Sequence, residues 1–318
     1  MPIPHGFLHD TPGGLLKVEN RTVDRHRTLF VVYRLIALLL LVPLLVLWVI
    51  PVYGQSAPGN GVAAPTLSGQ ALVDRALANE LNAAEDASHP MRYQLRKTSP
   101  RVTTTKEIME TRDGEVARLI AINDKPLSTI DEANEEARLH ALLGDPAKQR
   151  RRKQAEDDDS GRVLKVLRAL PDAFLYQDAG PGQGPTGKVE KFTFRPNPGF
   201  DPLYLETEVL PAMTGEIWID PVRLRVARLE GHLQKDVDFG WGILGRLNKG
   251  GWIVIEQADV GPDMGIDQWR TVRFQMQMSG RVVIKTRVFD TTETQTNYAP
   301  LPLGMSYQKA IELLLSGK

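Results

Sequence analysis

The sequence predicts an α+β fold centred on a strongly curved antiparallel sheet, a half-open β-barrel of about eleven strands with helices covering its concave face. Between residues 215 and 280, short runs rich in Val, Ile, Trp and Phe are separated by turn sequences such as Asp220-Pro221. The clearest run, residues 270–278, alternates apolar and polar positions, so one face of that strand is apolar and the other is wet. Helical periodicity is confined to a few segments, which adds helices to a meander of strands.

Composition excludes several classes of function. The 318 residues are 42% hydrophobic, enough to build a sizeable core in one or two domains. The 39 basic residues balance 39 acidic ones, so nucleic acid gains no general electrostatic attraction and is not an expected partner. The absence of cysteine excludes disulfides, thiolate metal sites, a cysteine nucleophile and acylation of an N-terminal cysteine.

The segment from Leu35 to Ile50 is an uncharged apolar run. Basic residues are clustered upstream of it, up to Arg34, and the next one downstream is Arg75. The positive-inside rule therefore keeps residues 1–34 in the cytoplasm as an n-region and exports everything beyond residue 54. The sequence predicts a periplasmic or otherwise exported body, either released or anchored in the inner membrane.

Residues 35–54 fit both a signal peptide and a membrane anchor. The small residues around Gly54 suit cleavage by signal peptidase, which makes residues 35–50 an h-region. Against cleavage, the n-region is long and contains acidic residues, and the apolar flank at 29–33 lengthens the run into a span. Residues 55–66 are rich in Gly, Ala and Pro and predict a flexible linker.

Residues 67–318 are expected to form a single exported domain. Its first elements are a helix over 67–86 and strands over 91–97, 102–111 and 115–122. A helical insertion follows at 128–170, in two helices of which Pro171 closes the second. In this insertion the i,i+4 spacing of Lys153 and Asp157 favours a solvated helix face over a basic patch for nucleic acid or lipid head groups.

The remaining elements are mostly strands. Strands are expected over 173–176, 189–194 and 203–209, then through the meander, and last over 281–289. Residues 291–296 are polar and predict an exit from the sheet, and residues 306–315 predict a short helix. Gly182, Gly184 and Gly187 match a dinucleotide-binding pattern, but the next segment alternates like a strand where the motif needs a helix. No nucleotide or other cofactor is expected.

Catalytic and metal motifs are not visible in the exported body. Its three histidines are His89, His140 and His232, and none belongs to an H-E-x-x-H sequence or an i,i+4 pair. No G-x-S-x-G elbow occurs. We therefore expect neither a metal site nor an enzyme, unless His140 or His232 lies beside two carboxylates in a cleft.

Two resemblances extend this interpretation. The sequence Gly215-Glu216-Ile217-Trp218-Ile219-Asp220-Pro221, followed by residues 225–229, resembles the LolA-like superfamily of lipoprotein carriers. That likeness implies a half-open barrel whose mouth is plugged by helices, although the charged insertion departs from the carriers. Residues 171–175, 195–198 and 236–251 are similar to an uncharacterised family of exported bacterial proteins, which implies no particular activity.

The leading hypothesis is a non-enzymatic envelope protein that binds a lipid or the acyl chains of a lipoprotein. The wall of the site would be the apolar stripe of the meander together with one tryptophan of the 236–251 segment: Val272, Phe274, Met276, Met278 and Trp241. The helix at 67–86 would cover this stripe only partly and leave a cavity of roughly a few hundred Å³. Alternatively the stripe is filled core, and the protein is a membrane-anchored interaction or sensor protein without a small-molecule ligand.

Overall fold

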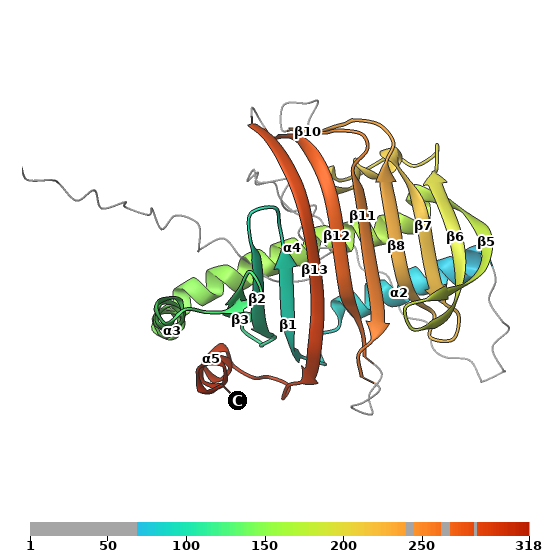
Figure 1. The fold of residues 1–318 in the computed structure, drawn as a ribbon. Helices are drawn as coiled ribbons and strands as arrows, with labels where there is room; N and C mark the ends of the chain where they lie inside the picture. Colours follow the sequence, from blue (N-terminus) through green and yellow to red (C-terminus); the bar gives the residue numbers. More distant parts are fainter. Residues whose placement is uncertain (1–68, 240–244, 262–267, 283–284, 318) are drawn as a thin grey trace, which may run out of the picture.

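The computed structural model describes residues 69–239, 245–261, 268–282 and 285–317. It confirms an α+β fold with one large antiparallel sheet, in which thirteen strands are described (Figure 1). The strand order is β4-β3-β2-β1-β13-β12-β11-β8-β7-β6-β5, with the small β9–β10 pair joined to β12. The sheet ends at β4 on one side and at β5 on the other, so it is not closed into a barrel.

The strands lengthen from the β4 edge toward the centre of the sheet. Their bounds are β1 Met91–Thr98, β2 Thr103–Met109, β3 Val116–Ile122, β4 Lys125–Pro126, β5 Phe174–Gly184, β6 Gly187–Pro196, β7 Met213–Asp220, β8 Arg225–Leu233, β9 Val237–Phe239, β10 Gly245–Leu247, β11 Trp252–Asp259, β12 Trp269–Val282 and β13 Lys285–Pro300. The helices are α2 Gln70–Glu85, α3 Thr129–Leu143, α4 Pro146–Ala173 and α5 Tyr307–Ser316, with 3-10 turns η1 Leu205–Thr207 and η2 Leu210–Ala212.

One face of the sheet, which we call the α4 face, lies under the long helix α4 (Figure 1). Residues directly opposite one another mark it across seven strands: Phe192, Ile217, Leu229, Ile255, Phe274, Glu293 and Lys97. The first five are apolar and the last two are charged. The α4 face therefore changes character between β12 and β13, from an apolar half to a polar half.

Helix α4 begins at a cap made by Asp145, whose side chain accepts a hydrogen bond from the backbone N–H of Lys148. Pro171 does not close the helix as predicted but lies inside its last turn, and α4 ends at Ala173. Because Pro171 has no N–H, it cannot donate to the carbonyl oxygen of Leu167, and the helix ends two residues later. Lys153 and Asp157 form the predicted i,i+4 ion pair, with 2.8 Å between Nζ and Oδ1.

Helix α2 forms where predicted, but it does not cover the stripe of residues 272–278. Its apolar side packs instead against β5–β8 and α4, in a cluster that contains Phe192 and Ile217. The carboxylate of Glu80 fixes this position because it accepts hydrogen bonds from the Arg225 side chain at 2.8 Å and from the Val226 backbone N–H at 2.9 Å. A charge-assisted anchor thus determines which strands the helix covers.

The segment after β6 is not the strand predicted at 203–209. It forms η1 and η2, two 3-10 turns that cross the end of the α4 face. Thr207 stabilises the first turn locally, since its hydroxyl donates to the Tyr204 carbonyl oxygen at 2.8 Å. Pro202 and Pro211 also lack the backbone N–H that a central strand would need.

The glycine-rich segment at 178–187 belongs to a long hairpin, in which β5 and β6 pair until Gly184 faces Gly187. Strand β6 follows these glycines, as the alternation of residues 189–194 predicted. The predicted polar exit at 291–296 is wrong, because those residues continue β13 between β1 and β12. Polar side chains of β13 are buried there, so the polar composition misled the sequence prediction. Gly250, between β10 and β11, has a φ of 86°, a left-handed conformation that glycine adopts without strain.

Candidate functional site: an apolar cavity under helix α4

A cavity of about 110 Å³ lies between α4 and the sheet. Helix α4 supplies one wall through side chains at i, i+3, i+4 and i+7: Val163, Val166, Leu167 and Leu170. The opposite wall is formed by apolar residues of β5–β12 and by the η1–η2 segment. Among the described residues that line the cavity, Glu206 is the one charged side chain.

Two facing glycines allow close packing on the sheet side of the cavity. Gly231, which lines it, is opposite Gly215 in the β7–β8 pair, and the ring of Phe194 reaches over both. A Cβ atom on Gly231 would lie 2.5 Å from the end of the Met213 side chain, and one on Gly215 would lie 1.8 Å from the Glu230 carbonyl oxygen. The space that a side chain would take at these two positions is thus already occupied, and the glycines allow the neighbouring groups to approach the sheet closely.

The predicted site residues divide between the cavity and the packed core. Met278 lines the cavity. Phe274 and Met276 lie in the adjoining core cluster, where Phe274 is 1% exposed, and Val272 is half-buried outside that cluster. Trp241 lies outside the described residues. The volume is also smaller than the few hundred Å³ expected from the sequence.

Sequence reasoning missed the residues that form most of this site. The stripe of α4 was visible as helical periodicity, but nothing indicated which strands it would cover. Leu205 and Glu206 lie in a segment that was predicted to be a strand. The pair of glycines carries no signal by itself, because its effect depends on the register between β7 and β8.

We call the place where the lining residue Glu206 meets the partly exposed Lys165 the mouth of the cavity. Nζ of Lys165 on α4 lies 3.2 Å from Oε1 of Glu206, and also 4.9 Å from the centre of the Tyr204 ring. Glu206 is 8% exposed, whereas the Lys165 side chain is 38% exposed. Lys165 therefore stands between the apolar space and the solvent.

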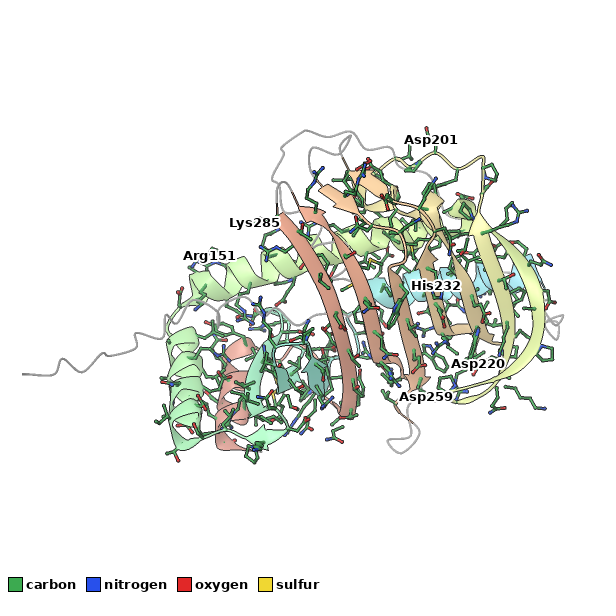
Figure 2. The ribbon with its side chains drawn as sticks, turned by 45° about the horizontal axis from the view of Figure 1, so that its top comes forward. Arg151, Asp201, Asp220, His232, Asp259 and Lys285 are labelled. Carbon is green, nitrogen blue, oxygen red and sulfur yellow. The ribbon has the colours of Figure 1, made fainter. Side chains whose placement is uncertain are left out.

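A second depression, open and polar, lies on the opposite face over β5–β8 and measures about 560 Å³. His232 lines it (Figure 2), with Nε2 2.9 Å from Oε1 of Glu230, and Glu216 faces Glu230 across the β7–β8 pair. Hydrogen bonds from Arg228, and also from His232, lower the pKa of Glu230. A carboxylate held ionised in this way is poorly suited to act as a general acid. His140, the other histidine considered as a catalytic residue, is exposed on α3.

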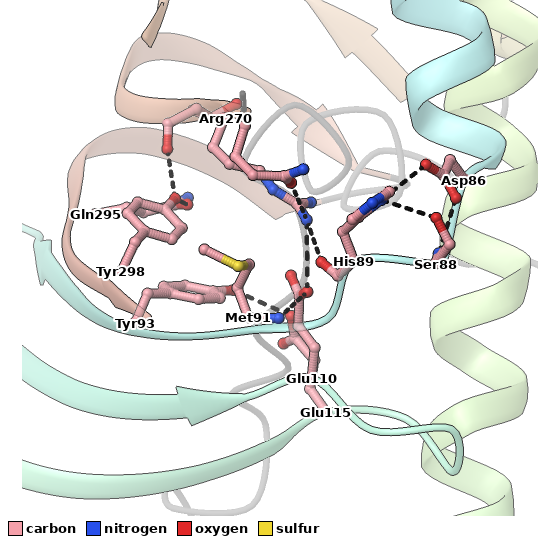
Figure 3. Close-up of polar contacts among 12 residues, drawn as sticks. Asp86, Ser88, His89, Met91, Tyr93, Glu110, Glu115, Arg270, Gln295 and Tyr298 are labelled. Carbon is pink, nitrogen blue, oxygen red and sulfur yellow. Dashed lines mark hydrogen bonds and ion pairs between the residues drawn. The ribbon is translucent and has the colours of Figure 1, made fainter. Parts of the chain in front are cut away.

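Asp86, Ser88 and His89 lie together after α2, but their geometry differs from that of a catalytic triad (Figure 3). The same ring atom, Nδ1 of His89, is 2.8 Å from the Ser88 hydroxyl and 3.3 Å from the Asp86 carboxylate. A triad needs one nitrogen for the nucleophile and the other for the acid. The arrangement is a local turn contact.

A buried titratable cluster joins α2 to the sheet (Figure 3). Arg270 donates to the His89 carbonyl oxygen at 2.6 Å and lies 4.0 Å from the Glu110 carboxylate, which accepts the Met91 backbone N–H at 2.8 Å. Burial raises the pKa of Glu110, although Arg270 and the Met91 N–H act in the opposite direction. Burial and the nearby Glu115 also raise the pKa of Tyr93 well above its ordinary value.

This cluster predicts a pH effect on stability. Because the folded-state pKa of Glu110 is raised, its contribution is present at pH values below the unfolded pKa, about 4.3, and is lost as the pH rises through the folded pKa. Glu110→Gln cannot ionise and still accepts the Met91 N–H. Its unfolding free energy relative to the parent should therefore rise between pH 4 and pH 7, as measured by urea denaturation. The exposed Glu312→Gln is the control, and a difference for Glu110→Gln that does not change with pH would contradict the prediction.

The described ranges contain neither a metal-ligating cluster nor a helix able to span a membrane. No group of three or more His, Asp or Glu side chains there is placed so that it could hold a metal ion. No helix there has both the length and the apolar character that crossing a membrane requires. The apolar run at 35–50 is outside those ranges.

No family model, no curated protein and no solved structure matches the chain. The geometry of the cavity and its mouth is therefore the evidence from which a function can be inferred.

Proposed function

We propose that this protein is a non-enzymatic binder of hydrophobic ligands, which takes up a lipid tail or an acyl chain of a lipoprotein in the cavity under α4. One observation carries the proposal: a cavity of about 110 Å³ whose lining is apolar except at its mouth. Apolar cavities of about 150 Å³ bind benzene-sized molecules, so a space of this kind favours an apolar occupant.

The volume limits what the closed form holds. A cavity of 110 Å³ takes a ring or a short alkyl segment. A complete acyl chain would need α4 to move away from the sheet, and each methylene that it buries would contribute about 0.8 kcal/mol toward that movement. The carrier-like resemblance fits this proposal, and so does the export expected from the sequence, which would place the body on the outer side of the inner membrane.

A second candidate is an anchored envelope protein that contacts a partner protein. The packed surroundings of Phe274 favour it, because that part of the stripe has no space for a ligand. Exposed aliphatic side chains such as Leu203, 82% exposed, and Val222, 84% exposed, would suit a contact surface.

Filling the cavity separates the two candidates. Calorimetric titration of the full-length protein with octanol should show binding, and Leu167→Trp should weaken it more than about tenfold, because the indole would occupy the space. Leu164→Trp is the matched control, since Leu164 is on the same helix but does not line the cavity. Octanol bound elsewhere, including at residues 35–50, would be unaffected by Leu167→Trp. No binding, or equal binding by both variants, would leave the interaction protein as the better hypothesis.

A further inference from the structure

We propose that the ligand is an anionic amphiphile, a fatty carboxylate whose head group is bound by Lys165 at the mouth of the cavity while its chain lies under α4. This inference rests on the proposed function. It adds the chemistry of the head group and the place where the ligand enters, both of which follow from the Lys165–Glu206 pair.

The first step is the position of the pair. Glu206 lines the cavity and is almost completely buried, and Lys165 reaches it from α4 at 3.2 Å. The next residue outward is Tyr204, which is 48% exposed and has the Lys165 ammonium over its ring. A chain that leaves the cavity past η1 must therefore place its polar end beside Lys165.

The second step is the donor capacity of Lys165. An ammonium group has three N–H donors, and Glu206 takes one at 3.2 Å. The Tyr204 ring attracts the charge without accepting a conventional hydrogen bond. A carboxylate head group can thus bond to Lys165 while the pair with Glu206 stays intact.

The third step compares other head groups. An ammonium head would have to displace Lys165 from Glu206 and take over a buried carboxylate. A hydroxyl head would also accept a hydrogen bond from Lys165, but as a neutral group. It would therefore bind Lys165 less strongly than a carboxylate, whose own charge strengthens the hydrogen bond. The expected order of affinity for equal chains is carboxylate, then alcohol, then amine.

Chain length provides an independent expectation. Each methylene that enters the cavity should strengthen binding about fourfold, until the chain fills the space. The gain from hexanoate to octanoate should then exceed the gain from octanoate to decanoate, because the apolar space is small.

The test is a calorimetric titration of the full-length protein with octanoate, octanol and octylammonium. In the parent, octanoate should bind at least about tenfold more tightly than octanol. Lys165→Gln should abolish this preference, and Lys165→Arg should retain it. Lys153→Gln is the control, because Lys153 is also an ion-paired lysine of α4 but lies away from the mouth.

The outcomes separate this inference from the function on which it rests. Octanol and octanoate binding equally, or a preference for octanoate that survives Lys165→Gln, overturns the head-group assignment and leaves the cavity function intact. A preference for octylammonium also overturns it, because Glu206 would then be the head-group residue. Binding of none of the three probes overturns the proposed function itself.

Discussion

Replacing Phe274 by alanine is expected to lower the free energy of unfolding by about 3–5 kcal/mol. The ring is 1% exposed and lies in a cluster with Ile255 and Leu247, so its removal leaves a hole that the surrounding strands cannot close. Urea denaturation of the variant and the parent at one temperature measures the loss. Val272→Ala is the control, because Val272 is on the same strand but is half-buried outside the cluster.

The same variant tests where the packed core ends and the cavity begins. Val272→Ala should cost about 1 kcal/mol or less, and Phe274→Ala should leave octanol binding measurable wherever the protein remains folded. A loss below about 1 kcal/mol for Phe274→Ala would show that the ring borders free space. Phe274 would then belong to the ligand wall, as the sequence suggested, and the cavity would extend toward β13.

Local patterns predicted most elements of the fold correctly because they are caused by neighbours in the chain. Ser128 and Ser306 cap α3 and α5, and each accepts a hydrogen bond from the backbone N–H three residues on. The alternation in β1 and β12 reflects two faces with different surroundings. These signals do not depend on knowing which elements meet.

The errors arose where distant segments decide the structure. Residues 291–296 are polar yet lie in the middle of the sheet, where Thr291, Glu293 and Gln295 are buried on the α4 face. The position of α2 is determined by Glu80, whose partners are about 145 residues further along the chain. No short-range periodicity contains that information.

The candidate site was predictable only in part for the same reason. Met278 was identified from the alternation in β12, and it does line the cavity. The close packing on the sheet side comes from the register that brings Gly215 opposite Gly231, and the mouth comes from two turns that the composition presented as a strand. The strands that the apolar stripe of α4 covers, β5–β12, all follow the helix in the sequence, and nothing local to the helix indicates which of them it meets.

The second large effect on stability is expected in the polar half of the α4 face. Next to Phe274 in the cross-strand row, Glu293 is only 2% exposed, and its carboxylate accepts a hydrogen bond from Lys97 at 2.6 Å. A buried carboxylate is stabilised chiefly by such a partner, because burial removes most of its hydration. The ion pair therefore holds β1 and β13 together at a point where apolar packing gives way to charge.

Lys97→Met is expected to lower the free energy of unfolding by about 3–5 kcal/mol, because the methionine leaves Glu293 buried without this cation. Adding Glu293→Leu should recover most of that loss, since two apolar side chains then fill the place of the pair, and replacing a buried pair in this way is often neutral. Urea denaturation of the parent, both single variants and the double variant completes a thermodynamic cycle. Lys309→Met is the control, because its pair with Glu312 is exposed and should contribute less than about 1 kcal/mol. If the double variant were as unstable as the sum of the two single variants, the Lys97 and Glu293 side chains would be acting independently, and the pair would not be what joins β1 to β13.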